Sequence, residues 1–317
     1  MNRWQIKPVT AQDKAAVITL FNQVFAPQTM SEALWHWKYD QGLGFAAWRG
    51  EEMIAHYGGI LREIRYFGEI KLAVQITDVM VLSTERAVFT KQGAFFQVTS
   101  AFLEQHIGYE ATTWVGYGFP SHRHVKLAQR LGLYAPVGEV IELRWQSMQG
   151  KPHLWTRIRH LQSNQLKIQK IVDKLWKNMY LSLSNSLVSI RDWQYVQHRY
   201  FSHPHHSYEL LLLTHRFTTQ ALAIIVVVRA QEQCKVMDFI GDIRHIPETI
   251  QQIRRIASYW GLKSVSLWIS RGFIDYFPPA EQRTLDIFIP HNIWSPCFPP
   301  EQIQDKWWLM AGDTDFL

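Results

Sequence analysis

Cysteine is scarce in this sequence, and its two residues, Cys234 and Cys297, lie far apart in the chain. They form neither a C-x-x-C pair nor the spacing of a metal-ligand set. We therefore expect no disulfide framework and no metal, and a compartment that keeps thiols reduced.

Long hydrophobic runs are also missing. The longest, Ala221 to Val228, has eight residues, whereas a membrane-spanning helix needs about 20. The first ten residues, MNRWQIKPVT, lack the apolar stretch of a signal peptide. These absences predict a soluble, cytoplasmic protein without a membrane partner.

Blocks of like charge are absent as well. The formal net charge is +6 and the isoelectric point is about 9.2, but lysine and arginine are scattered along the chain. Nucleic-acid-binding tails concentrate their positive charge, so no nucleic-acid partner is expected. A mild basic excess suits a small polyanionic ligand equally well.

Apolar residues, in contrast, make up 47% of the 317 residues, enough to fill two domains of roughly 150 residues each. Residues 4–9 alternate as a strand does, Thr10 is placed to cap a helix, and Ser31 begins a second helix. Three antiparallel strands are predicted between residues 44 and 81. The first half then continues with a helix over 94–106, a strand over 111–118, a helix over 122–132 capped by Gly132, and a strand over 138–145.

The same order begins again in the second half. After helical sequence over 164–184, His198-Arg199-Tyr200 aligns with Trp37-Lys38-Tyr39 at an offset of 161. Strands, a helix over 247–261 and a strand over 264–270 then follow as in the first half. A repeated order of elements indicates duplication. We therefore predict two related α+β domains, residues 1–148 and 149–317, each with a mixed sheet that contains one parallel strand pair.

Two stretches of the first half resemble the GNAT superfamily of acyl-CoA N-acyltransferases. In that family a strand is followed by V-x-P-x-x-R-G-x-G-x-G and a helix, and Val81 and Arg86 match its Val and Arg. The sequence then departs from the pattern, because Ala87 replaces the first Gly and extra residues precede Gly93. Further on, YGFPSHRHVKLAQRLGLY is similar to the family's G-[FY]-P-N segment and the helix that follows, with Ser121 in place of Asn.

The resemblance covers residues 1 to about 145 well and the remainder loosely. It implies tandem GNAT-like domains, of which the first binds acetyl-CoA or another acyl-CoA as co-substrate. In the family, strand backbone holds the pantetheine arm, a role that falls here on Met80, Val81 and Leu82. The pyrophosphate binds at the loop and the helix N-terminus. The corresponding residues are Arg86, Lys91, Gln92, Gly93, Ala94 and Phe95.

The implied reaction is direct attack of an amine, from a small molecule or a peptide, on the acyl thioester. The amine must lose a proton, and the leaving thiolate must gain one. Asp78 in the strand and Glu85 in the loop are the candidate bases. Tyr117 and Tyr134, on either side of the helix over 122–132, are the candidate acids. Alternatives at the start of that helix are Ser121, His122 and His124.

The second half has no Gly-rich anion loop before its helix over 247–261, so it is expected not to bind a cofactor. Its histidine-rich stretch, residues 203–206, lacks the carboxylate or cysteine that would complete a metal site. Two other functions stay open. The altered loop favours a non-catalytic module that binds acyl-CoA or a partner, and tandem GNAT enzymes that use aminoacyl-tRNA suggest a related transferase. The sequence does not identify the acceptor or the oligomeric state.

Overall fold

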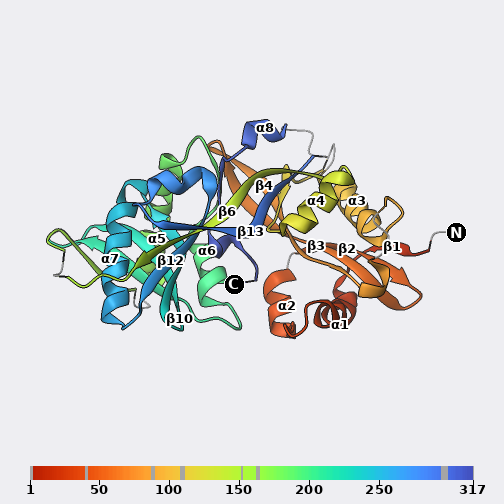
Figure 1. The fold of residues 1–317 in the computed structure, drawn as a ribbon, viewed down its shortest axis with the longest axis horizontal. Helices are drawn as coiled ribbons and strands as arrows, with labels where there is room; N and C mark the ends of the chain where they lie inside the picture. Colours follow the sequence, from red (N-terminus) through yellow and green to blue (C-terminus); the bar gives the residue numbers. More distant parts are fainter. Residues whose placement is uncertain are drawn as a thin grey trace. The chain divides into compact units, whose positions relative to one another are not determined.

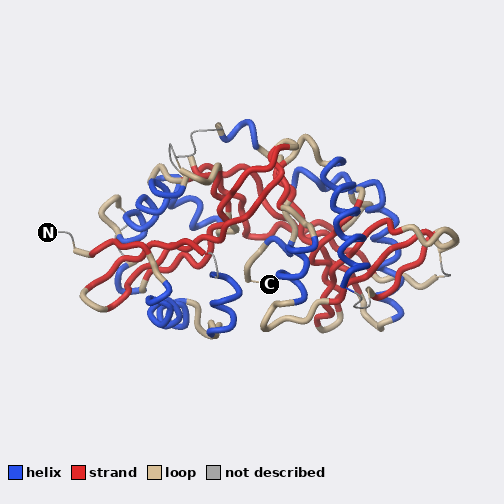
Figure 2. Tube along the Cα trace, turned by 180° about the vertical axis from the view of Figure 1, so that it is seen from behind, coloured by secondary structure: helices blue, strands red, loops and turns tan. Residues whose placement is uncertain are grey.

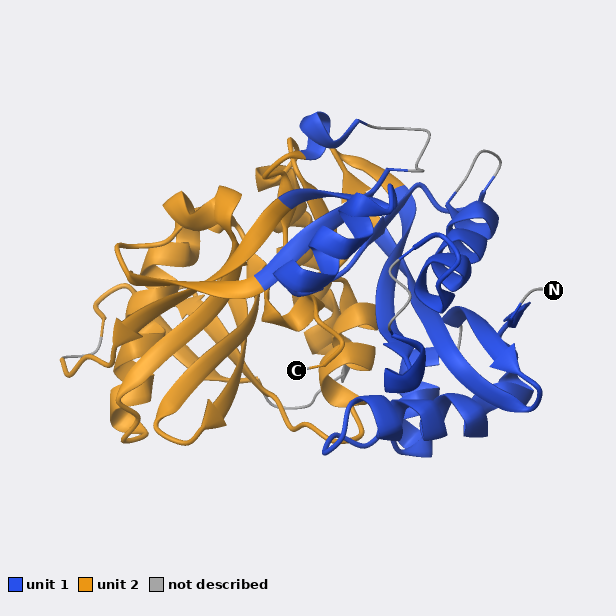
Figure 3. Cartoon of the chain, turned by 45° about the vertical axis from the view of Figure 1, so that its right-hand side comes forward, with its two compact units in different colours: residues 1–63, 71–137, 287–303 blue, residues 64–70, 138–286, 304–317 orange. Residues whose placement is uncertain are grey.

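A computed structural model of the protein describes residues 3–39, 42–86, 90–107, 111–150, 153–161, 165–293 and 299–316. It contains two seven-stranded mixed sheets with helices packed on them (Figures 1 and 2), which confirms the predicted fold class. The chain divides into two compact units (Figure 3). Unit 1 comprises residues 1–63, 71–137 and 287–303, and unit 2 comprises residues 64–70, 138–286 and 304–317.

The first sheet has the order β1-β2-β3-β4-β5. These strands are β1 (Gln5–Pro8), β2 (Gly42–Arg49), β3 (Glu52–Tyr66), β4 (Glu69–Val81) and β5 (Val115–Tyr117). Two short strands of unit 2 extend it, since β8 (Leu187–Ser189) pairs with residues 64–66 of β3 and β14 (Trp307–Trp308) pairs with β8. The strands β1 and β2 are antiparallel, as are β2 and β3, whereas β4 and β5 are parallel.

Alternating side chains of these strands supply a separate core on each face of the sheet. Ala46 packs with residues of α1 (Lys14–Val24) and α2 (Glu32–Tyr39). Its neighbours Phe45 and Ala47 pack instead with α3 (Ala94–His106). Successive strand residues point to opposite faces, so a run that is apolar throughout supplies both cores.

The predicted helix ends are confirmed at three places. The Thr10 N–H donates to the Asp13 carboxylate at 2.8 Å in a 3₁₀ turn that leads into α1. The Ser31 hydroxyl accepts from the Leu34 N–H at 3.1 Å at the start of α2. Gly132, at φ 72°, ends α4 (His122–Arg130) in the left-handed conformation that glycine adopts at low cost.

The second sheet has the order β13-β6-β12-β11-β10-β9-β7. Its strands are β6 (Tyr134–Gln146), β7 (Thr156–His160), β9 (Glu209–His215), β10 (Ala221–Ala230), β11 (Gln233–Gly241), β12 (Ser264–Ser270) and β13 (Glu281–Asn292). The remaining helices are α5 (Gln165–Ser182), α6 (Trp193–Val196), α7 (Ile246–Tyr259) and α8 (Pro300–Ile303). Within the described ranges, no helix has both the length and the apolar character needed to cross a bilayer.

Two strands differ from the sequence prediction. The strand expected to close the first half forms part of β6, whose residues 140–146 pair antiparallel with β12 of the second sheet. The strand β13 was not predicted at all. Its first half, EQRTLD, is mostly exposed and Pro290 lies near its end. An edge strand with no buried alternating face carries no periodic hydrophobic signal, and edge strands tolerate proline.

Candidate active site

The parallel strands β4 and β5 remain paired only over a short distance. Three pairs are in register, from Ala73 with Val115 to Gln75 with Tyr117, and β5 then ends while β4 continues to Val81. Among the described strands, none replaces β5 beside residues 76–81, which we call the open edge of β4. A divergence at the carboxyl ends of parallel strands is a common place for a ligand to bind.

Asp78 lies in the middle of this edge and has an unusual backbone. Its φ is 47°, a left-handed value that is costly for a residue with a side chain. The carboxylate is held by two residues of α2. Lys38 Nζ donates to it at 2.8 and 3.1 Å, and the Tyr39 hydroxyl donates at 2.6 Å. Because both oxygens are engaged and both charged side chains are buried, the contacts favour a structural role for Asp78, and its role as a base stays a prediction.

The carbonyl of Asp78 also has a partner, the ring of His56. The distance from His56 Nδ1 to the carbonyl oxygen is 2.8 Å, and His56 on β3 is 1% exposed. Burial lowers the pKa of this ring below its ordinary value. A neutral ring that carries its proton on Nδ1 donates to the carbonyl and supports the irregular backbone at Asp78.

We expect His56 to make the protein less stable as the pH falls. In the unfolded chain the ring regains its ordinary pKa of about 6.5, so below that pH the unfolded state binds the extra proton and is favoured. His56→Asn keeps a donor near the carbonyl and does not titrate. In thermal denaturation between about pH 7.5 and 5, this variant should lose up to about 1.4 kcal/mol less stability per pH unit than the parent. Equal pH slopes for the two proteins would contradict the assignment.

Glu85 occupies the turn that follows β4 and is 3% exposed. One carboxylate oxygen lies 2.6 Å from Arg49 Nη1 of β2, and the other lies 3.0 Å from Arg3 Nη2. These ion pairs tie the start of the loop to β2 and to the N-terminal segment. The arrangement favours a positioning role, and a role for Glu85 as the base also stays a prediction.

Two of the backbone groups expected to hold pantetheine already have hydrogen-bond partners in different parts of unit 1. The Leu82 N–H donates to the Ile54 carbonyl at 2.9 Å and is therefore bonded to β3. The Val81 carbonyl accepts from Arg86 Nε at 2.8 Å, which brings an exposed guanidinium to the end of β4. The side chain of Met80 is fully buried in the core under α1 and α2.

The loop before α3 is described in part, because Ala87, Val88 and Phe89 lie outside the described residues. Within it, the N–H groups of Gln92 and Gly93 are bonded to the Thr90 hydroxyl and carbonyl. The first N–H groups of a helix have no partner within the helix. At the start of α3 these groups belong to Ala94 and Phe95. The exposed Lys91 lies near this turn, with its Nζ 5.9 Å from the centre of the Phe96 ring.

The two candidate acids have different surroundings. Tyr117, at the end of β5, is 1% exposed, and its ring is nearly perpendicular to that of Phe119, with 6.2 Å between ring centres. The hydroxyl of Tyr134 contacts that of Tyr57, a fully buried residue of β3 that the sequence analysis did not single out. Burial raises the pKa of Tyr134, so its hydroxyl keeps its proton at neutral pH.

The alternatives at the start of α4 already contact other groups. Ser121 Oγ lies 3.0 Å from His124 Nδ1. The ring of His122 stacks on Phe288, with 5.1 Å between ring centres. The catalytic roles of Tyr117, Tyr134, Ser121, His122 and His124 therefore stay predictions.

Solved structures similar to almost the whole chain identify the fold. A probable N-acyltransferase from Enterococcus faecalis V583 has a TM-score of 0.68 at 12% identity, covering 93% of this chain and 73% of its own. A GCN5-related N-acetyltransferase from Kribbella flavida has a TM-score of 0.64 at 12% identity, with 93% and 72% covered. This chain has the GNAT fold.

The N-myristoyltransferase of Saccharomyces cerevisiae, solved with bound myristoyl-CoA, is similar as well. Its TM-score is 0.55 at 12% identity, and the match covers 92% of this chain and 79% of that one. No protein-family model and no curated protein sequence matches the chain. At this level of identity the similarity establishes the GNAT fold and leaves the activity to be argued from the site.

Unit 2 repeats the GNAT-like arrangement, including one polar contact. The strands β11 and β12 are parallel, as β4 and β5 are. Tyr200, which aligns with Tyr39, donates its hydroxyl proton to Asp238 of β11 at 2.7 Å. Asp238 lies 160 residues after Asp78, close to the offset of 161 that relates the two tyrosines. A tyrosine–aspartate contact made in both halves supports the tandem duplication.

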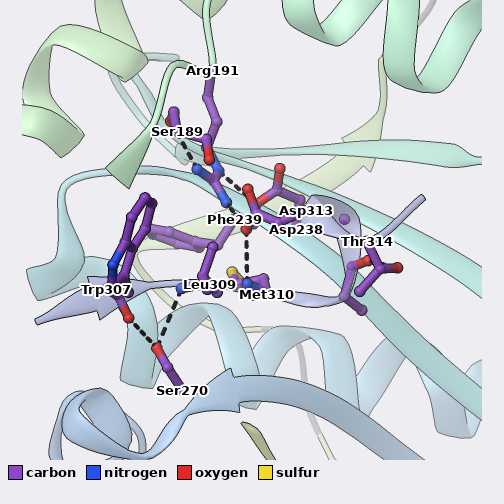
Figure 4. A network of polar contacts seen from close by, with 12 residues as sticks. Ser189, Arg191, Asp238, Phe239, Ser270, Trp307, Leu309, Met310, Asp313 and Thr314 are labelled. Carbon is purple, nitrogen blue, oxygen red and sulfur yellow. Dashed lines mark hydrogen bonds and ion pairs between the residues drawn. The ribbon is translucent and has the colours of Figure 1, made fainter. Parts of the chain in front are cut away.

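The corner of unit 2 that corresponds to the open edge of β4 is filled by the protein itself. Pairing of β11 with β12 ends at Val236 and Leu267, although both strands continue. Met310 forms a bridge with Ile269, and the Ser270 N–H donates to the Leu309 carbonyl at 3.1 Å. Figure 4 shows this segment next to Arg191, which lies between the carboxylates of Asp238 and Asp313.

The helix that follows β11 also differs from its counterpart in unit 1. Pro247 lies in the first turn of α7 and has no N–H group, and Glu248 places a negative charge in the same turn. Both changes disfavour a phosphate. The nearby Arg244 is paired with Asp242 at 2.6 Å. These features support the prediction that the second unit does not bind the cofactor.

The histidine-rich stretch of unit 2 forms a turn. The ring of His203 accepts from the backbone N–H groups of His205 and His206, each at 3.1 Å through Nδ1. In the part of the chain that the structure describes, no group of three or more His, Cys, Asp or Glu side chains is arranged to hold a metal ion.

Proposed function

We propose that the protein is an acyl-CoA-dependent N-acyltransferase that moves an acyl group, acetyl in the simplest case, to the amine of a small molecule or a peptide. The observation that carries the proposal is the juxtaposition in unit 1 of an open strand edge and a helix N-terminus. The open edge of β4 is followed along the chain by residues 82–93 and then by α3. The pantetheine arm of CoA is extended and ends in phosphates. The arm can therefore lie along the strand edge while the phosphates reach the helix N-terminus.

In this proposal unit 1 holds the co-substrate. The N–H groups of Ala94 and Phe95 and the positive end of the α3 dipole bind the pyrophosphate. Arg86 and Lys91, both exposed beside the loop, add positive charge. The pantetheine arm lies along the open edge of β4, near the Val81 carbonyl. Unit 2, whose corner is filled by residues 309–313, contributes no second cofactor site.

The chemistry is a direct transfer. The amine nitrogen attacks the thioester carbonyl carbon, the C–N bond forms and the C–S bond breaks, and the products are an amide and free CoA thiol. The amine loses one proton and the thiolate gains one. Tyr134, whose buried hydroxyl is protonated at neutral pH, is a candidate donor for the second step, although its raised pKa makes it a weaker acid than an exposed tyrosine. Positioning of the two substrates supplies most of the acceleration.

A non-catalytic acyl-CoA-binding module is the second candidate. The observation in its favour is that both candidate bases are already paired: Asp78 lies in a buried ion pair with Lys38, and the buried carboxylate of Glu85 pairs with the more exposed Arg3 and Arg49. Two measurements separate the candidates. Acetyl-CoA should raise the melting temperature in either case, because it binds only the folded state. Release of free CoA thiol in the presence of a panel of amines should occur only with the enzyme, and no thermal shift with any acyl-CoA would refute both.

Phe95→Glu is expected to weaken acyl-CoA binding at least tenfold. The new carboxylate enters the first turn of α3, where it repels the pyrophosphate and opposes the anion-binding role of the helix end. Isothermal titration calorimetry measures the effect. Phe95→Gln controls for the lost aromatic ring, and Gln105→Glu adds the same charge near the other end of α3. If Phe95→Gln weakens acyl-CoA binding as much as Phe95→Glu does, or if Phe95→Glu does not weaken it, the phosphates do not bind at the start of α3.

A further inference from the structure

The outer strand of the second sheet lies along a groove that the proposed function does not use. The strand β7 is at the end of the sheet order and pairs on one side with β9. A cavity of about 610 Å³ is lined by the whole of β7, by residues 148–150 and by the second half of α7. Successive strand residues face opposite sides of a sheet. A cavity that all of them touch therefore runs along the free edge of β7.

Two hydrogen bonds fix which backbone groups of β7 point into the groove. The Arg216 N–H donates to the Trp155 carbonyl, and the Leu161 N–H donates to the Leu210 carbonyl. In an antiparallel pair alternate residues bond to the partner strand. Odd-numbered residues of β7 therefore bond to β9. The N–H and C=O groups of Ile158 and His160 point outward, and no other described residue pairs with them.

The charge of the groove is strongly one-sided. Four arginines and two histidines line it, and none of the described lining residues is acidic, although Glu248 lies 3.1 Å from His153 and Glu209 lies 3.5 Å from His160. Neither the Arg157 nor the Arg159 side chain, both exposed, has an ion-pair or hydrogen-bond partner among the described residues. The six basic residues are His153, Arg157, Arg159, His160, Arg216 and Arg255.

The two faces of β7 differ in chemistry. Thr156 contacts Gln252 and Glu248 of α7, so Ile158, two residues later, shares the face that α7 covers. Leu211 and Ile256 line the groove together with Ile158. Arg157 and Arg159 point to the opposite face. A strand added here meets Ile158, Leu211 and Ile256 together with His160 and Arg255 on one face, and the guanidinium groups of Arg157 and Arg159 on the other.

We propose that the free edge of β7 binds an extended acidic peptide segment of a partner protein as an additional strand of the sheet. The peptide backbone pairs with Ile158 and His160. Acidic residues at alternate positions pair with Arg157 and Arg159, and the apolar residues between them pack toward Ile158. Strand addition gives affinity through backbone hydrogen bonds and specificity through alternate side chains.

The test uses the full-length protein and a fluorescein-labelled decapeptide of alternating Glu and Val. Fluorescence anisotropy at about 150 mM salt should show saturable binding that weakens as salt rises. A peptide of the same composition with its Glu and Val residues in two blocks should bind at least tenfold more weakly. Hydrogen exchange should show new protection at Ile158 and His160 when the alternating peptide is bound.

Three variants complete the test. Arg157→Glu/Arg159→Glu should weaken binding at least tenfold, whereas Arg283→Glu/Lys306→Glu, equal in charge change and outside the groove, should not. Ile158→Pro removes an outward N–H that β9 does not use and should also weaken binding. Circular dichroism confirms folding of each variant. No binding, equal binding of the blocked peptide or of a ten-residue oligothymidylate, or an unchanged affinity of a folded Ile158→Pro variant would overturn the proposal.

Discussion

Lys38→Met should destabilise the protein by about 3–5 kcal/mol, the usual cost of leaving one charge of a buried ion pair without its partner. The side chains of Lys38 and Asp78 are 3% and 6% exposed, and the ammonium lies 2.8 Å from the carboxylate. After the substitution the Asp78 carboxylate keeps, among the described residues, the Tyr39 hydroxyl as its hydrogen-bond donor at 2.6 Å. Urea denaturation followed by circular dichroism measures the loss.

The double variant Lys38→Met/Asp78→Asn gives the matched control. It removes both charges and keeps a polar group that Tyr39 can contact, so most of the stability should return. The control also addresses catalysis. If the double variant is stable and still releases CoA thiol, Asp78 acts as a structural residue. A Lys38→Met variant as stable as the parent would show that the ion pair is not buried in solution.

Arg191→Met should have an effect at least as large in unit 2. Its guanidinium is fully buried and contacts two carboxylates, Asp238 at 2.8 Å and Asp313 at 2.5 Å, as well as the Ser189 carbonyl at 2.9 Å (Figure 4). The substitution leaves two buried carboxylates close together without their shared cation. We expect a loss of about 3–5 kcal/mol or more, which for a marginally stable protein means failure to fold at moderate temperature.

Arg244→Met is the matched control for Arg191→Met, because Arg244 also pairs with an aspartate but is 85% exposed. Its loss should change stability by less than about 1 kcal/mol. Limited proteolysis of the two variants at increasing temperature compares them even if Arg191→Met is poorly soluble. Similar protease resistance of the two variants would contradict the importance of the buried network.

Much of the fold follows from local patterns. The helix predicted over 94–106 is observed as Ala94–His106, and the strand predicted over 264–270 is observed as Ser264–Ser270. These segments have clear apolar periodicity and clear ends. The strand β13, whose first half is exposed, and the two-residue strand β14 have neither. For the same reason the sequence does not reveal that β6 pairs with β12, because strand pairing over a long sequence separation leaves no local signal.

The candidate site was predicted less completely than the fold. The sequence identified the strand end, the loop and the start of α3, but it did not pair Asp78 with Lys38 and Tyr39, or Tyr134 with Tyr57. One signal was present. The alignment that relates Tyr39 to Tyr200 also relates Asp78 to Asp238 within one residue. Residues that recur together in both halves of a duplicated chain are candidates for mutual contact.

The sequence by itself determined the order of most helices and strands, the duplication and the start of α3 at the end of a loop, because each depends on residues close together in the chain or on their repeated order. Only the tertiary structure decided which polar side chains are buried against one another. Lys38 and Asp78 are 40 positions apart, and Arg191 and Asp313 are 122 apart. Their pairing depends on how the sheets bring distant segments together, and burial then makes an otherwise ordinary ion pair energetically important.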